Sequence, residues 1–236
     1  MLFRSLQKVY FKDLGSIEYG EAWKYQESLL FENADIKKSI SNGNLNRDTT
    51  HHLLFCEHPP VYTLGKSGKE EHVLVSKEEL TRRNIAYYET NRGGDITFHG
   101  PGQIVGYPIL DLEKYYRDIG KYLRSLEEVI ILTLAEYGIK GERSKGETGV
   151  WIDPDHKMKA RKICAMGVRC SRWITMHGFA LNVNTNLEYF SMIVPCGIAD
   201  KQVTSLEKEL GKKIEMEEVK NVLIEKFKVI FECEVV

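Results

Sequence analysis

The residue best suited to covalent chemistry in this chain is a cysteine that stands between a proline and a glycine. Cys196 lies in the segment IVPCGIAD, with Pro195 before it and Gly197 after it. Both neighbours disfavour helix and strand interiors, so a thiol at this position belongs to a turn and is placed to reach a cleft. Free cysteines are more often buried and inert, and the turn alone therefore leaves a structural thiol as the commoner interpretation.

A glycine-rich segment, RGGDITFHGPGQ at residues 92–103, is the second candidate. Its glycines stand at positions 93, 94, 100 and 102. Glycine permits positive φ angles and lets backbone N–H groups come close to a ligand. The segment has neither the Gly-Lys-Ser/Thr of a Walker A loop nor the G-x-G-x-x-G order of a dinucleotide-binding fold. A tight hairpin with a surface loop is the alternative.

A basic cluster supplies the candidate proton carrier. Lys157, Lys159, Arg161 and Lys162 precede the apolar run ICAMGV. Most such clusters are solvated faces. Lys162 leads directly into the apolar run, however, where a partly desolvated ammonium would lower the pKa of a nearby thiol and exchange protons itself.

Histidines offer two weaker candidates. His177, beside Gly178, either lines a pocket or is a satisfied core histidine. In HHLLFCEH at residues 51–58, a strand would place His52, Cys56 and His58 on one face. Zinc sites usually need four ligands in close pairs, and no second pair is evident, so no metal is expected.

Hydrophobic spacing predicts mixed helices and antiparallel strands without a strict βαβ rhythm, which indicates an α+β layered fold. Helices are expected at 17–31, 76–84, 119–137 and 216–227, and strands at 7–12, 52–57, 61–65, 85–89, 103–112, 149–153, 162–170, 174–184 and 231–235. The last three strands before the final helix read as a β-meander. Residues 33–50 are polar and read as a flexible insertion in a single catalytic domain of residues 1–236.

Composition narrows the class of protein. The net charge of −1 gives no global field for nucleic acid. No apolar run approaches the roughly 20 residues that span a membrane, so no membrane partner is expected. The N-terminus shows no signal peptide, and the five cysteines suit no disulfide framework, which together predict a cytoplasmic protein.

Taken together, and in this order, these segments resemble the octanoyltransferase family of lipoate biosynthesis. The matching stretches are HPPVYTLG at 58–65, RGGDITFHGPGQIVGYPILDL at 92–112, TGVW at 148–151, KICAMGVR at 162–169, HGFALNVN at 177–184 and PCGI at 195–198. The resemblance implies an α+β fold with one large and one small, mostly antiparallel sheet flanked by helices, similar to the catalytic domain of lipoate and biotin protein ligases.

The resemblance also implies roles for individual residues. Cys196 matches the acyl-accepting nucleophile and Lys162 the lysine paired with it, with Lys159 as the fallback because the preceding turn is long. Three segments match the acyl-binding residues, which are Arg92, Gly93, Gly94, Asp95, Ile96, Thr97, Phe98 and His99, then Ala165, Met166 and Gly167, then Gly178, Phe179 and Ala180. An acyl slot is expected to have Phe98, Met166, Phe179 and Ile104 in its walls, so that Gly178→Leu or Met166→Trp would favour shorter chains.

The implied reaction moves an octanoyl group from an acyl carrier protein thioester to a lysine of a lipoyl carrier domain. The implied acceptors are the lipoyl domains of 2-oxoacid dehydrogenase complexes and the glycine cleavage H protein, and the implied state is a monomer. No cofactor is expected, because thioester exchange followed by amide formation requires no ATP.

Four alternatives stay open at this point, of which the least favoured is a metal-binding regulator built on HHLLFCEH. A lipoate–protein ligase would activate a free acid with ATP and would not need Cys196. An amidotransferase would move octanoyl between carrier proteins. A non-catalytic protein that binds acyl carriers would retain full function without Cys196 or Lys162.

Overall fold

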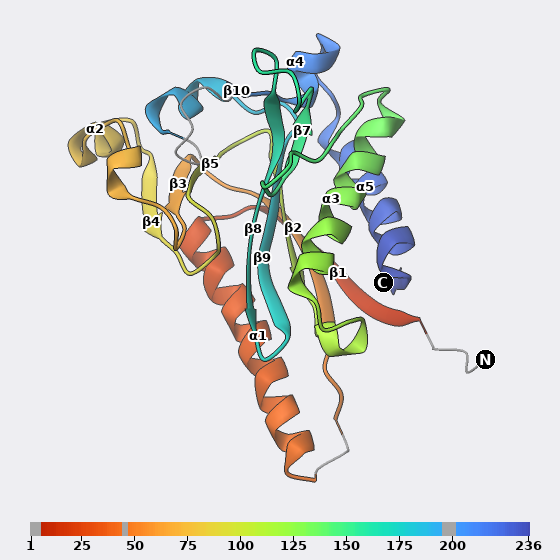
Figure 1. Ribbon diagram of the computed structural model, residues 1–236. Helices are drawn as coiled ribbons and strands as arrows, with labels where there is room; N and C mark the ends of the chain where they lie inside the picture. The colour runs from red at the N-terminus through yellow and green to blue at the C-terminus, as the bar shows by residue number, and fades with distance from the viewer. Residues whose placement is uncertain (1–5, 44–46, 195–201) are drawn as a thin grey trace.

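The structure is a computed structural model that describes residues 6–43, 47–194 and 202–236. Its centre is a large sheet in the order β10-β8-β9-β6-β2-β1-β11, with β7 paired to β8 (Figure 1). The strands of this sheet are β1 (Gln7–Ser16), β2 (His51–Glu57), β6 (Gln103–Ile109), β7 (Val150–Ile152), β8 (Arg161–Ser171), β9 (Ile174–Asn182), β10 (Gln202–Val203) and β11 (Cys233–Val235).

A second, three-stranded sheet in the order β4-β3-β5 lies beside the large one. It is built from β3 (Val61–Leu64), β4 (Ala86–Glu89) and β5 (Ile96–His99). β3 runs antiparallel to β5 and parallel to β4. Since β5 continues through a short turn into β6, the glycine-rich segment links the small sheet to the middle of the large one.

Helices cover both faces of the large sheet (Figure 1). They are α1 (Tyr19–Ser41), α2 (Lys77–Arg82), α3 (Ile119–Glu136), α4 (Leu206–Leu210) and α5 (Met216–Phe231), with single turns η1 (Glu70–His72), η2 (Leu112–Lys114) and η3 (Leu187–Met192). On one face α3 and α5 enclose a core with Phe179 and Leu181 of β9. On the other face α1 packs through Ala22, Leu29 and Leu30.

The predicted α+β fold with a large and a small sheet is confirmed, and so is the β-meander. β7, β8 and β9 pair antiparallel in sequence, as do β2, β6 and β9 at the centre of the sheet. The predicted start of α2 is also confirmed, because the Ser76 hydroxyl accepts a hydrogen bond from the Glu79 N–H at 3.3 Å.

The predicted loop at residues 33–50 is wrong for its first half. α1 continues to Ser41, because Asn33 and Ile36 prolong the buried stripe of the helix. The amide of Asn33 accepts from the Thr50 N–H and donates to the Thr50 carbonyl, so its polar group is satisfied inside the core. Lys37 pairs with Asp111 and Glu113. Polar residues that look like a loop in the sequence therefore hold the helix to the sheet.

Among the described residues, no helix combines the length and the apolar character that crossing a bilayer would require.

Candidate active site

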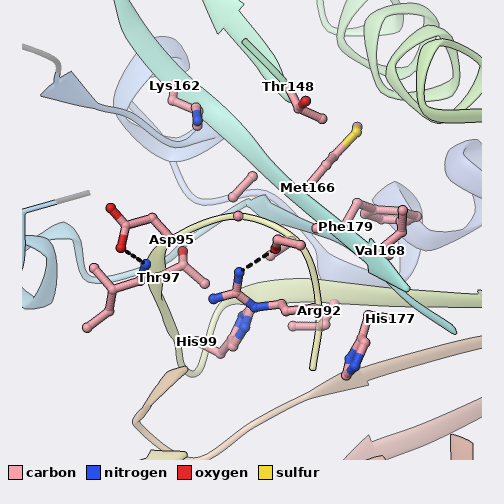
Figure 2. A pocket seen from close by; sticks show the side chains of 18 of the residues that line it. Arg92, Asp95, Thr97, His99, Thr148, Lys162, Met166, Val168, His177 and Phe179 are labelled. Atoms are coloured by element: carbon pink, nitrogen blue, oxygen red, sulfur yellow. Dashed lines mark hydrogen bonds between the residues drawn. The ribbon is translucent and has the colours of Figure 1, made fainter. Parts of the chain in front are cut away.

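A cavity of about 580 Å³ lies against the large sheet and is bordered by the glycine-rich segment (Figure 2). Its described lining comes from residues 92–97, β6, β8, β9 and the start of α1 and α3. Fourteen of the sixteen residues that the resemblance assigns to the site line it, namely Arg92, Gly93, Gly94, Asp95, Ile96, Thr97, His99, Lys162, Ala165, Met166, Gly167, Gly178, Phe179 and Ala180.

Four small residues form the floor of the cavity. Ala165 of β8 pairs with Ala180 of β9, and Gly167 pairs with Gly178 in the same ladder. Ala165 and Ala180 each carry only a methyl group over the sheet, and Val105 of β6 continues their row beside Ala180. The floor is therefore a shallow apolar trough across neighbouring strands.

The rim of the cavity, residues 92–95, lies directly on this floor. The Gly93 N–H donates to the Val168 carbonyl at 2.9 Å. A Cβ at Gly167 would stand 2.6 Å from the Gly93 oxygen, so only glycine permits this contact. Gly94 itself has φ of +88°, which lets the chain turn back toward Gly65. The glycines thus bring the rim to the sheet.

Arg92 fixes the rim to the small sheet. Its side chain is 7% exposed, and its guanidinium donates to the Thr63 carbonyl, to the Thr63 hydroxyl at 2.9 Å and to the Gly93 carbonyl at 3.0 Å. Hydrogen bonds to a charged donor of this kind are stronger than neutral ones. Figure 2 shows the guanidinium on the same side of β8 as His99 and His177.

A directed chain of hydrogen bonds runs along one end of the cavity. Gln103 donates its amide N–H to the carbonyl of Phe98 and to the amide oxygen of Asn182, so its own oxygen faces His99. His99 then donates from Nδ1 to that oxygen at 2.8 Å, and Thr63 donates to His99 Nε2 at 3.3 Å. Complete burial lowers the pKa of His99 well below its usual value. The ring is therefore neutral with its tautomer fixed.

His177 lies at a distortion of β9. It adopts φ of +58°, and its N–H leaves the ladder to donate to the Gln26 side chain at 2.9 Å. Its ring Nε2 contacts Asn91 at 2.8 Å, while the buried Nδ1 has no hydrogen-bond partner among the described residues. Burial, together with Arg92 and Arg169, lowers the pKa of this histidine to about 3. No sequence pattern marked Gln26 or Asn91 as a site residue, because each contacts His177 from a position far away in the sequence.

Lys162 lies on β8 at the cavity, close to where β7 and β10 pair with that strand. Its ammonium stands 4.6 Å from the centroid of the Trp151 ring, in a cation–π contact. Lys159, the fallback, is exposed on the turn before β8 and is not among the lining residues. Geometry therefore favours Lys162.

Cys196 lies outside the described residues. Residues on both sides of it in the sequence, Phe190 on one side and Gln202 with Val203 on the other, line the cavity. Two described thiols are poor nucleophiles, because burial raises the pKa of Cys56 and of Cys164 far above its usual value.

Two expected wall residues are placed elsewhere. Phe98 stacks on Tyr189 with ring centroids 4.5 Å apart and packs in the core of the small sheet. Ile104 is buried in the core beneath α3 and α5. Ile104 faces away from the floor because it alternates with Val105 on β6, and Phe98 is held by its packing against Tyr189 and Phe190. Their expected place in the slot is therefore wrong, whereas Met166 and Phe179 do line the cavity.

The cluster HHLLFCEH has structural roles. His58 contacts the Tyr107 hydroxyl and the Ile17 carbonyl, each at 2.7 Å, and lies 3.5 Å from the Cys56 sulfur. His52 contacts the Thr50 hydroxyl at 3.0 Å. Within the part of the chain that the structure describes, no three His, Cys, Asp or Glu side chains are grouped as metal ligands would be.

Residues 18–228 match the family model described as the lipoyl protein ligase A/B catalytic domain. The chain is 56% identical over 229 residues to an octanoyltransferase of Christiangramia forsetii, with 97% of each chain covered. It is 55% identical over 231 residues to an octanoyltransferase of Flavobacterium johnsoniae, covering 98% of this chain and 99% of the relative.

Solved structures share the fold at low sequence identity. A lipoate-protein ligase A bound with ATP has a TM-score of 0.68 at 16% identity, covering 98% of this chain and 87% of the other. A bipartite lipoate protein ligase from Thermoplasma acidophilum also has a TM-score of 0.68, at 17% identity, covering 98% of this chain and 86% of the other.

Proposed function

This chain belongs to the lipoyl protein ligase A/B catalytic domain family, and we propose that it is an octanoyltransferase of lipoate biosynthesis. It transfers an octanoyl group to a lysine of a lipoyl carrier domain. Identity above 50% to octanoyltransferases over nearly the full length carries this conclusion. The cavity supports it, because a trough floored by alanine and glycine beside a lysine suits an unbranched acyl chain with a reactive end.

We propose that the octanoyl group passes through Cys196. The thiolate attacks the carbonyl carbon of an octanoyl-acyl carrier protein thioester, a new C–S bond forms, and the carrier thiolate leaves and takes up a proton. The neutral amine of the acceptor lysine then attacks the acyl-enzyme. A C–N bond forms, the C–S bond to Cys196 breaks, and the amide product is released.

Lys162 is the proposed partner in both steps. Its ammonium would favour ionisation of the thiol, which has an ordinary pKa of about 8.5. In the second step the neutral amine of Lys162 would accept the proton that the attacking lysine of the lipoyl domain loses. The pairing is supported by the described residues on either side of Cys196 in the sequence, because Phe190, Gln202 and Val203 line the same cavity as Lys162.

The acyl chain would lie on the floor, beside the rim and Arg92. Each buried CH₂ contributes about 0.8 kcal/mol, so the length of the trough sets the preferred chain. Gly178→Leu is not a useful probe of that length. A Cβ at position 178 would stand 2.2 Å from the backbone oxygen of Gly106, so the variant would distort the sheet before it narrowed the slot.

We further propose that residues 1–236 act as a single catalytic domain and as a monomer. Lipoyl domains of 2-oxoacid dehydrogenase complexes and the glycine cleavage H protein are the proposed acceptors. A cytoplasmic location is proposed as well, because the four described cysteines are unpaired, as expected in a reducing compartment.

Product analysis separates this function from an ATP-dependent ligase. Purified protein is incubated with a lipoyl domain and either octanoyl-acyl carrier protein without ATP or free octanoate with ATP. Octanoylated domain, identified by mass in the first reaction, supports the proposal. Product in the second reaction alone would establish a ligase and contradict it.

A further inference from the structure

The segment between β3 and α2, residues 65–74, contacts the rim and the described residues that precede Pro195 and Cys196 in the sequence. The N–H groups of Lys66 and Ser67 donate to the carbonyls of Arg92 and Gly94, at 3.0 and 3.1 Å. The Gly65 N–H donates to the Asp95 carbonyl at 3.2 Å. This first half of the segment is therefore hydrogen-bonded to the rim of the cavity.

The second half of the segment pairs with residues 192–194. The Leu74 N–H donates to the Met192 carbonyl at 2.9 Å, and the Val194 N–H donates to the His72 carbonyl at 2.8 Å. Val73 and Ile193 form an antiparallel bridge between these two bonds. The last described residue before Pro195 and Cys196 is thus anchored on the backbone of His72.

His72 also contacts the rim through its side chain. Its Nδ1 atom lies 2.7 Å from Oδ2 of Asp95, a close contact that does not have hydrogen-bond geometry and that is an ion pair only when the ring is protonated. The two side chains are 17% and 11% exposed, so water screens the contact only partly. The other oxygen of Asp95 accepts from the Ile96 N–H at 2.7 Å, which fixes the carboxylate at the start of β5.

Gly68 packs closely against this pair. A Cβ at Gly68 would stand 2.8 Å from Oδ1 of Asp95 and 2.3 Å from the Leu64 side chain, so the lack of a side chain at residue 68 lets the turn approach both. His72 therefore joins two parts of the site at once, the rim through its ring and residues 192–194 through its carbonyl.

We propose that His72 is a positioning residue for the acyl transfer, and that it acts with Asp95. The pair holds the rim and the segment before Cys196 in a fixed relation, so that the acyl chain on the floor meets the thiol in a reactive orientation. This inference rests on the proposed function and adds a residue to it. Neither His72 nor Asp95 is proposed to exchange protons with the substrate.

A single-turnover experiment tests the proposal. Octanoylation of the protein by octanoyl-acyl carrier protein is followed by intact mass for wild type, His72→Gln, Asp95→Asn and the double variant. Asp95→Asn retains the oxygen that accepts from Ile96 but removes the charge that faces His72. Glu71→Gln is the matched control, because Glu71 is exposed and its ion-pair partner is Lys69.

The expected result is roughly a ten- to hundredfold slower octanoylation in each single variant, the size of effect that a small misplacement of reacting groups produces. The KM for the lipoyl domain and the melting temperature should stay near the wild-type values. The double variant should be no slower than the slower single variant, since the two residues act as one unit.

Wild-type rates in His72→Gln, or effects of the two variants that multiply in the double variant, would overturn the inference alone. If wild type itself gains no octanoyl group, the proposed acyl-enzyme fails and this inference fails with it. A parallel loss of melting temperature and rate in both single variants would assign the pair to folding and also overturn the positioning role.

Discussion

The floor and the rim of the cavity are built in opposite ways. The floor, Ala165, Gly167, Gly178 and Ala180, consists of small residues on paired strands whose backbone groups serve the sheet. The rim, residues 92–95, is irregular backbone held by main-chain hydrogen bonds and by the charged side chains of Arg92 and Asp95. The floor gives the cavity its shape, and the rim gives it polar groups.

This difference indicates how the two regions should respond to change. A floor residue lies on paired strands, and at Gly167 and Gly178 added atoms would meet neighbouring backbone at less than 3 Å. A rim residue such as Gly93 contacts the backbone of β8 on one side and faces the cavity on the other. Substitutions in the floor should therefore act on stability or chain selectivity, and substitutions at the rim or beside it should act on rate.

The largest effect on the rate of octanoyl transfer is expected at Lys162, the proposed reactive group on β8. Lys162→Met should slow octanoyl transfer by about 10²- to 10⁴-fold, the range lost with a general acid–base group. Lys159→Met is the matched control and should retain nearly full activity, because Lys159 is exposed outside the cavity. Steady-state transfer to a lipoyl domain measures both. Equal losses in the two variants would contradict the assignment.

A steric test compares one glycine from each region. Gly178→Leu should lower the free energy of unfolding by about 3 kcal/mol or more, through overpacking against the Gly106 backbone. Gly93→Ala should cost much less, because its new Cβ would meet the nearest atom, the Val168 oxygen, at 3.4 Å. Urea denaturation of both variants measures the difference. Equal costs would refute the contrast between floor and rim.

A third test uses the floor to change substrate choice. Ala165→Leu fills part of the trough and should shift preference from octanoyl toward shorter chains, by about fourfold to tenfold per methylene. Phe98→Leu is the control and should leave chain selectivity unchanged, because Phe98 packs away from the cavity. Competition between hexanoyl and octanoyl donors gives the ratio. A shift with Phe98→Leu alone would reverse the assignment of the slot walls.

The smallest expected effect concerns pH. Burial lowers the folded-state pKa of His177 to about 3 and of His51 to about 4, against about 6.5 in the unfolded chain. Below pH 6.5 the unfolded state therefore binds more protons than the folded state. The free energy of unfolding keeps its full value above that pH and falls as the pH decreases toward the folded-state pKa values. His177→Gln should reduce the slope by up to about 1.4 kcal/mol per pH unit. Parallel curves for variant and wild type would show that His177 does not contribute.

Sequence alone predicted the parts of the site that leave a local pattern. Glycine density marked the rim, and the position of Lys162 before an apolar run marked the edge of the floor. The order of the motifs then indicated the family and with it the α+β fold. Phe98 was misplaced because its orientation depends on which strands pair, and that pairing is not local.

The remaining features depend on tertiary contacts. Asn33 and Lys37 look like loop residues until Thr50 and Asp111 are seen beside them. Gln26 has no signal of its own, and it matters because the N–H of His177 turns toward it. The pairing of His72 with Asp95 likewise joins residues from separate segments.

The most direct test of the central claim is the intact mass of the protein after brief exposure to octanoyl-acyl carrier protein, for wild type and Cys196→Ala. A gain of one octanoyl group in wild type and none in the variant is predicted, because Cys196 is the proposed acyl acceptor. Octanoyl transfer to a lipoyl domain by Cys196→Ala at the wild-type rate, or an equal mass gain in both proteins, would contradict the acyl-enzyme at Cys196.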